Sequence, residues 1–100
     1  MDNFRFAQLK YSSILILCYQ YFCLNDTDKA FEYLDIFEKA YPKRDENFVV
    51  IEQFIVNAYS SASAFYFVKG NYSEARKYLN KGLEYVPNNF ELKNRLRVLK

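Results

Sequence analysis

The sequence predicts an all-α protein, and three observations lead to this prediction. Gly and Pro occur only twice each in 100 residues, fewer than the tight turns of an all-β domain would require. Apolar residues recur at the i, i+3, i+4 and i+7 spacing that forms one face of an amphipathic helix. The sequence also resembles itself at an offset of 45 residues. We therefore expect two similar helical units in a single domain.

The second unit has the clearer pattern. Its later helix is predicted to begin at a capping residue, Asn71 or Ser73, and to end before Pro87. One face of this helix is apolar and contains Ala75, Tyr78, Leu79, Gly82, Leu83 and Val86. The helix before it has a stripe made of Tyr59, Ala62, Ser63 and Tyr66. Because only Gly70 and Asn71 separate the two helices, we expect an antiparallel hairpin.

The first unit repeats this plan. Seven identities at the 45-residue offset fall at structurally meaningful positions: Gln8 and Gln53, Tyr21 and Tyr66, Phe22 and Phe67, Ala30 and Ala75, Tyr33 and Tyr78, Leu34 and Leu79, Pro42 and Pro87. Its two stripes are expected to be Ile14, Leu17, Cys18 and Tyr21, then Ala30, Tyr33, Leu34 and Phe37. Residues 25–28 supply the turn and the caps, and Pro42 ends the hairpin. Since Phe37 stands where the second unit has Gly82, we expect the first hairpin to splay or tilt in order to hold a phenyl ring.

The spacing of these residues resembles the tetratricopeptide repeat, a helical hairpin with small and aromatic residues at fixed positions and a closing Pro. The residues that carry the resemblance are Tyr59, Ala62, Ser63, Tyr66, Ala75, Leu79, Gly82 and Pro87, and less fully Leu17, Cys18, Tyr21, Ala30, Leu34 and Pro42. It covers residues 11–42 and 56–90. The resemblance implies a right-handed stack of two antiparallel hairpins that binds another polypeptide.

The period of 45 residues is about eleven longer than the usual repeat of about 34, close to three helical turns. We therefore expect residues 4–10 and 46–55 to extend the first helix of each hairpin. Phe48, Ile51, Phe54 and Ile55 would continue the buried side. The single domain, residues 1–100, then divides into a degenerate repeat (1–45), a second repeat (46–88) and a capping helix (89–100) with Leu92, Leu96 and Leu99 inside.

The composition argues against an enzyme. The chain has no His, the commonest general base and zinc ligand, and no Gly-rich phosphate loop. Cys18 and Cys23 diverge by about 140° on a helix, so they should neither bridge nor share a metal. Cys18 is expected to be a core residue. We predict no cofactor, and two free thiols favour the cytoplasm. Residues 12–18 are a short apolar run that a secretory signal could also contain, but no segment is long enough for a membrane span.

Binding is the better-supported class of function. The first helix of each hairpin should present a second face toward a concave groove, formed by Ser12, Leu15, Tyr19, Phe22, Asn57, Ser60, Ala64 and Phe67. A peptide or helix of a partner protein would lie there. The groove lacks the Lys and Arg of clamps that grip a terminal carboxylate. The alternative is a structural or self-associating domain, or a piece of a larger repeat protein, whose aromatic surface contacts another copy. The net charge of +2 does not indicate nucleic acid, and the basic run near the end is thin support for it.

Overall fold

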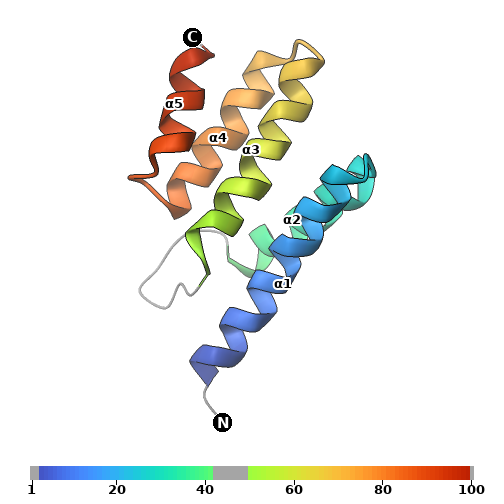
Figure 1. Ribbon diagram of the computed structural model, residues 1–100, viewed down its shortest axis with the longest axis vertical. Coiled ribbons are helices and arrows are strands. Elements are labelled where there is room, and N and C mark those ends of the chain that lie inside the picture. Colours follow the sequence, from blue (N-terminus) through green and yellow to red (C-terminus); the bar gives the residue numbers. More distant parts are fainter. Residues whose placement is uncertain (1–2, 42–49, 100) are drawn as a thin grey trace.

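Five helices make up the residues that the structure describes, 3–41 and 50–99, with side chains from residue 10 onward. The computed structural model bounds them as α1 Asn3–Cys23, α2 Thr27–Ala40, α3 Glu52–Val68, α4 Tyr72–Tyr85 and α5 Phe90–Val98 (Figure 1). α1 pairs with α2, α3 pairs with α4, and α5 packs against α4 and α3. These residues include no strand, so the predicted all-α class with two helix pairs and a C-terminal helix is confirmed.

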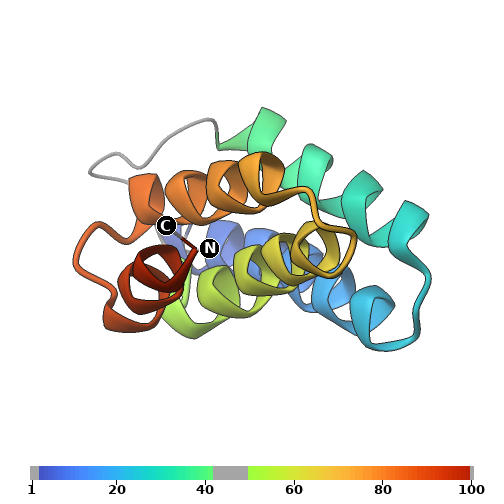
Figure 2. The same cartoon turned by 90° about the horizontal axis from the view of Figure 1, so that it is seen from above.

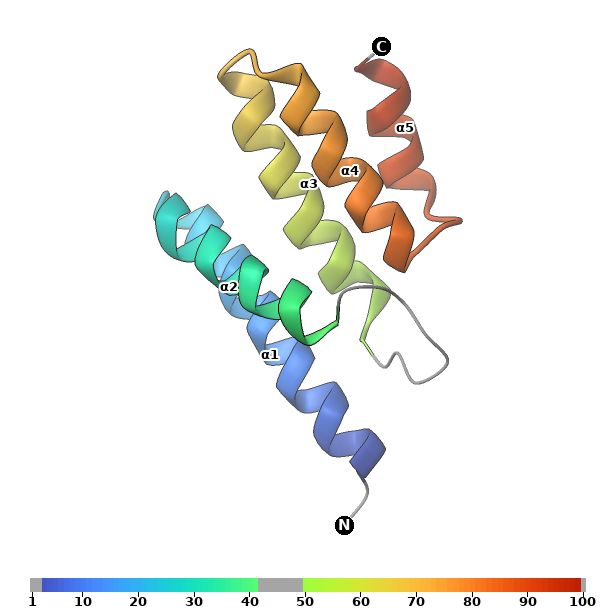
Figure 3. The same ribbon diagram turned by 180° about the vertical axis from the view of Figure 1, so that it is seen from behind.

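The helices lie in two layers. Viewed from above, α2 and α4 are on one side, and α1, α3 and α5 are on the other (Figure 2). From behind, α2 lies in front of α1 (Figure 3). Within the second layer α1 contacts α3 and α3 contacts α5, so the first helices of the hairpins and the C-terminal helix form one continuous face.

The 45-residue offset is repeated in the backbone. α2 and α4 each have 14 residues, and both their first and their last residues correspond at this offset. The N-cap of α2, Asp26, has φ −92° and ψ 73°, and the N-cap of α4, Asn71, has φ −91° and ψ 77°. Each cap side chain accepts a hydrogen bond from the backbone N–H three residues later. Before each cap stands a residue with positive φ, Asn25 at 62° and Gly70 at 79°, the two residue types that best tolerate this region.

Phe31 of α2 joins the two hairpins near their turns. Its ring lies 5.1 Å from that of Phe22 on α1, and 5.3 Å and 5.6 Å from those of Phe65 and Tyr66 on α3. Tyr78 of α4 lies 5.6 Å away. The pairs with Phe22 and Phe65 are edge-to-face, an arrangement that adds stabilisation beyond the area that the rings bury. Phe31 is therefore the apolar wedge at this end of the contact between the hairpins.

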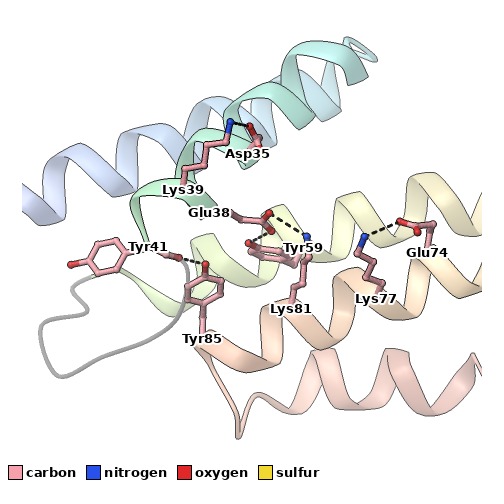
Figure 4. Close-up of polar contacts among 9 residues, drawn as sticks. All are labelled: Asp35, Glu38, Lys39, Tyr41, Tyr59, Glu74, Lys77, Lys81 and Tyr85. Atoms are coloured by element: carbon pink, nitrogen blue, oxygen red, sulfur yellow. Dashed lines mark hydrogen bonds and ion pairs between the residues drawn. The ribbon is translucent and has the colours of Figure 1, made fainter.

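A polar network joins the hairpins near the C-terminal end of α2 (Figure 4). The hydroxyl of Tyr59 on α3 donates a hydrogen bond of 2.8 Å to Glu38 Oε2, and Lys81 Nζ on α4 lies 3.2 Å from Glu38 Oε1. Tyr59 is fully buried, whereas Glu38 and Lys81 keep some contact with solvent. Further along, the hydroxyl of Tyr85 donates to the backbone carbonyl of Tyr41. One carboxylate thus links three helices from both pairs.

The two units differ in packing at one corresponding position, where the first unit has Phe37 and the second has Gly82. Phe37 is fully buried, and its ring lies 5.3 Å from that of Tyr85. At Gly82 an added Cβ would meet Leu92 Cδ1 at 2.9 Å and Tyr59 Cβ at 3.0 Å, closer than side chains tolerate. Gly82 therefore lets α4 approach both α3 and α5.

The predicted extension of α1 through residues 4–10 is confirmed. That of α3 is confirmed for residues 52–55 and wrong for residues 50 and 51, while residues 46–49 lie outside the described residues. α3 begins at Glu52, and Val50 and Ile51 precede it outside any helix. Ile51 is 47% exposed rather than buried, whereas Ile55 is in the core and Phe54 packs against it. Phe48 and the rest of the range 42–49, including Pro42, lie outside the described residues.

The predicted stripe of α1 is wrong at one position. Leu17 is 37% exposed, while Leu15, which we expected on the groove side, is fully buried. Cys18 is fully buried as expected, and Ile14 packs against the core. Because α1 contacts both α2 and α3, its buried arc is wide and is shifted toward α3. The sequence around Leu15 is apolar at five consecutive positions, so it does not define a single face.

α5 matches its prediction. The side chain of Asn89 caps it by accepting from the N–H of Leu92, which is fully buried. Leu96 and Leu99 pack against the same core. Within the described ranges, no helix combines the length and the apolar character that crossing a bilayer requires.

Candidate interaction surface

The structure brings the eight predicted site residues to one layer, on α1 and α3, but it exposes them unequally. Tyr19, Ala64 and Phe67 are exposed, and Phe22 and Asn57 are half-buried. Ser12, Leu15 and Ser60 are buried. A long helix that is covered on two sides leaves only a narrow strip open, which is why three of the eight lie below the surface. The role of all eight in binding stays a prediction.

An opening on this layer, which we name the tip cleft, lies between the C-terminal ends of α1 and α3. Its volume is about 620 Å³, within the range of ligand pockets. Tyr19, Phe22 and Ala64 line it, as predicted. Phe65 and Lys69 also line it and were missed. Phe65 directly follows Ala64, and Lys69 is the C-cap of α3. The Lys69 ammonium lies 4.8 Å from the centre of the Phe65 ring, a favourable cation–π distance.

Two smaller clefts lie on either side of the tip cleft. The base cleft, of about 370 Å³, is bordered by Leu15, Tyr19 and Asn57. The α5 cleft, of about 210 Å³, is bordered by Ala64, Phe67 and by α5. Tyr19 belongs to both the base and the tip cleft, and Ala64 to both the tip and the α5 cleft. The three clefts therefore follow one another across α1, α3 and α5.

The charged residues that line the clefts are all positive. The residues that line the three clefts include two cations, Lys69 and Arg95, and no carboxylate. The carboxylates of α2, by contrast, belong to the opposite layer (Figure 2). The remaining polar groups at the clefts are neutral amides, hydroxyls and a thiol. This surface is thus apolar and weakly positive.

The two thiols differ in environment. Both are free, with Cys18 buried and Cys23 exposed at the tip cleft. Burial, with a smaller contribution from the nearby Glu38 carboxylate, raises the pKa of Cys18 to about 12. A hydrogen bond with the Cys23 side chain raises the pKa of the Tyr19 hydroxyl. Cys18 therefore remains a neutral thiol at physiological pH and acts as a core residue, as the sequence predicted.

The described residues offer no place where three His, Cys, Asp or Glu side chains converge as a metal site would require. One buried polar atom stands out: the Ser12 hydroxyl has no hydrogen-bond partner among the residues that the structure describes. It belongs to none of the three clefts. The chemistry that the arrangement offers is apolar contact with a few hydrogen-bonding groups and two cations.

Comparison of the chain with protein-family models, with curated proteins and with solved structures gave no match. The function has to be argued from the fold and from the surface of α1, α3 and α5.

Proposed function

We propose that the protein is an interaction module that binds a segment of another polypeptide across α1, α3 and α5. The single observation that carries the proposal is the unbroken series of three clefts, joined through the shared residues Tyr19 and Ala64. An isolated pocket would fit a small ligand, whereas a series fits successive side chains of a peptide or a helix.

The chemistry of the lining residues defines the partner. Aromatic rings at Tyr19, Phe22 and Phe65 offer rigid apolar contact at low entropic cost. Lys69 favours a carboxylate beside these contacts and no lining carboxylate opposes it, whereas Arg95 is already paired with Glu91 within the chain. We therefore expect a segment that carries aliphatic or aromatic side chains and acidic residues.

The resemblance of the sequence to tetratricopeptide repeats supports the same proposal, since repeats of that family often receive peptides on the face formed by their first helices. The correspondence of α2 with α4 and of their caps at a 45-residue offset agrees with a repeat origin. Two free thiols, one of them exposed, favour the cytoplasm as the compartment. We propose no catalytic activity for this surface.

Filling the clefts with a single side chain tests the proposal. Ala64 is exposed and borders two clefts, so Ala64→Trp should obstruct them without disturbing the core. Ala40→Trp, at an exposed position of α2, is the matched control. Peptides selected from a random display library against the wild-type chain are then titrated by fluorescence anisotropy. We expect Ala64→Trp to weaken their binding at least tenfold and the control to leave it within twofold.

Two results would contradict the proposal. One is a selection that yields no peptide above background. The other is a set of selected peptides that bind both variants equally, with backbone amide shifts in NMR spectra confined to α2 and α4.

A further inference from the structure

The outer face of α5 carries an exposed aromatic ring and two cations that form no ion pair with the residues that the structure describes. Phe90 is 78% exposed, and it borders a shallow cleft of about 200 Å³ together with Lys93, Asn94 and Arg97. The spacing i, i+3, i+4 and i+7 places these four residues on one face of the helix. Asn94 also borders the α5 cleft, whereas Phe90, Lys93 and Arg97 do not.

α2 carries a matching face of opposite charge. Asp28, Glu32 and Ile36 stand at i, i+4 and i+8 along its exposed side, and Ile36 is 43% exposed. This side points away from the hairpin contact, because Phe31, Phe37 and Glu38 of the same helix face α3 and α4.

The other charges of these two helices are largely neutralised within the chain. Lys39 is paired with Asp35 at 3.0 Å, and Arg95 is paired with Glu91 at 3.3 Å. The remaining cation of α2, Lys29, lies 5.4 Å from the centre of the Tyr21 ring.

The four charges of the two matching faces, by contrast, have no ion pair with any residue that the structure describes: Asp28, Glu32, Lys93 and Arg97. The guanidinium of Arg97 donates only to the neutral Asn94 side chain among the described contacts. Two carboxylates on α2 and two cations on α5 are thus available to a partner of opposite charge.

The two faces lie at opposite ends of the row of helices, with the α1–α2 pair at one end and α5 at the other (Figures 1 and 3). They cannot meet within one chain, but they can meet between two copies. We propose that α5 of one copy packs antiparallel against α2 of a second copy, with Phe90 against Ile36, Lys93 against Glu32 and Arg97 against Asp28. The successive residues are three or four positions apart on both helices, so all three contacts can form in one register.

Such a contact is heterologous, so an assembly of any length keeps one unpaired α2 face and one unpaired α5 face. α5 has nine residues and is about 13 Å long, so the contact is smaller than a standard interface of about 1,600 Å². Association is therefore weak, rapid and sensitive to salt. The contact uses no residue of the three clefts, and it stands whether or not they bind a peptide.

Charge reversal in two complementary variants tests the proposal by sedimentation over a wide range of concentrations. In the first variant α5 carries Lys93→Glu and Arg97→Glu, and in the second α2 carries Asp28→Lys and Glu32→Lys. We expect the wild-type chain to form a series of oligomers whose size increases with concentration and which dissociate at high salt. Each variant alone should associate at least tenfold more weakly, since like charges then face each other. Mixing the two variants should restore association, because both contacts between unlike variants are again of opposite charge.

Further variants separate a lost contact from a lost helix. Phe90→Ser removes an exposed ring without new charge and should also weaken association. Lys77→Glu with Glu84→Lys, two exposed positions of α4, is the matched control and should leave association within twofold. Circular dichroism confirms that each variant keeps its helical content. A wild-type chain that stays monomeric at the highest concentration would overturn the proposal, as would a mixture of the two variants that fails to associate.

Discussion

The close approach at Gly82 leads to the sharpest prediction about stability. Glycine in the interior of a helix ordinarily lowers stability by about 0.5–1 kcal/mol relative to alanine, so Gly→Ala exchanges on open helix faces are stabilising. At position 82 we expect Gly→Ala to lower stability instead. The new Cβ would lie 2.9 Å from Leu92 Cδ1 and 3.0 Å from Tyr59 Cβ.

The size of this loss of stability depends on which two atoms the new Cβ would meet. Leu92 Cδ1 is the end of a flexible side chain and can move, but Tyr59 Cβ is attached to the α3 backbone. Tyr59 is also held by its hydrogen bond to Glu38. Overpacking against such a group costs about 1–3 kcal/mol, more than the gain in helix propensity. We expect Gly82→Ala to lose about 1 kcal/mol net, a fall in Tm of roughly 4–8 °C for a domain of this size.

Urea unfolding followed by circular dichroism measures the change. Asn80→Ala, at an exposed position two residues away on α4, is the matched control and should be neutral or raise stability by up to about 0.7 kcal/mol. If Gly82→Ala were as stable as the wild-type protein or more stable, the contact between α4, α3 and α5 would not be limited by the space at this position.

Three further predictions concern buried polar groups. Burial, together with the nearby Glu38 carboxylate, raises the pKa of Tyr85 to about 12 and that of Tyr59 further, so the folded chain keeps protons that the unfolded chain releases near pH 10. The free energy of unfolding should therefore keep its full value below about pH 10 and fall toward pH 12, by up to about 1.4 kcal/mol per pH unit for each group. The fall should be less steep in Tyr59→Phe. Urea unfolding midpoints at several pH values measure both. A thiol reagent at pH 8 should modify Cys23 at once and Cys18 only on unfolding, and rapid reaction of two thiols in the native protein would contradict the buried position of Cys18. Ser12→Ala removes a buried hydroxyl that has no hydrogen-bond partner among the described residues, so it should raise the free energy of unfolding by about 1 kcal/mol. A lower free energy of unfolding would mean that the hydroxyl is hydrogen-bonded.

The second helix of each hairpin was predictable because its signals are local. Asp26 and Asn71 cap their helices with their own side chains, and the apolar residues of α2 and α4 lie on one face between polar ones. α1 was harder because the run around Leu15 is apolar on all sides, and only the packing of α3 decides which residues become buried. The start of α3 was missed for a similar reason, since Ile51 fits the helical phase but lies outside the helix.

The candidate surface was only partly accessible to sequence reasoning. Tyr19 and Ala64 were placed by the rotation of a helix about its axis, which the sequence determines. The clefts themselves depend on the distance between helices, which the aromatic contacts of Phe31 and Phe37 set across the pairs. Arg95 was not among the predicted site residues, and only the position of α5 beside α3 brings it to a cleft.

The difference between Phe37 and Gly82 also bears on how this fold could be rebuilt from its parts. Although the two hairpins share their caps and turns, they are not interchangeable units. A tandem copy of the second hairpin would leave the volume of a phenyl ring empty beside Tyr85, and a tandem copy of the first would force that ring into the space that Leu92 occupies. The residues at positions 37 and 82 therefore determine the order of the hairpins along the chain. An array with more repeats would need a residue of suitable size at this position for every junction.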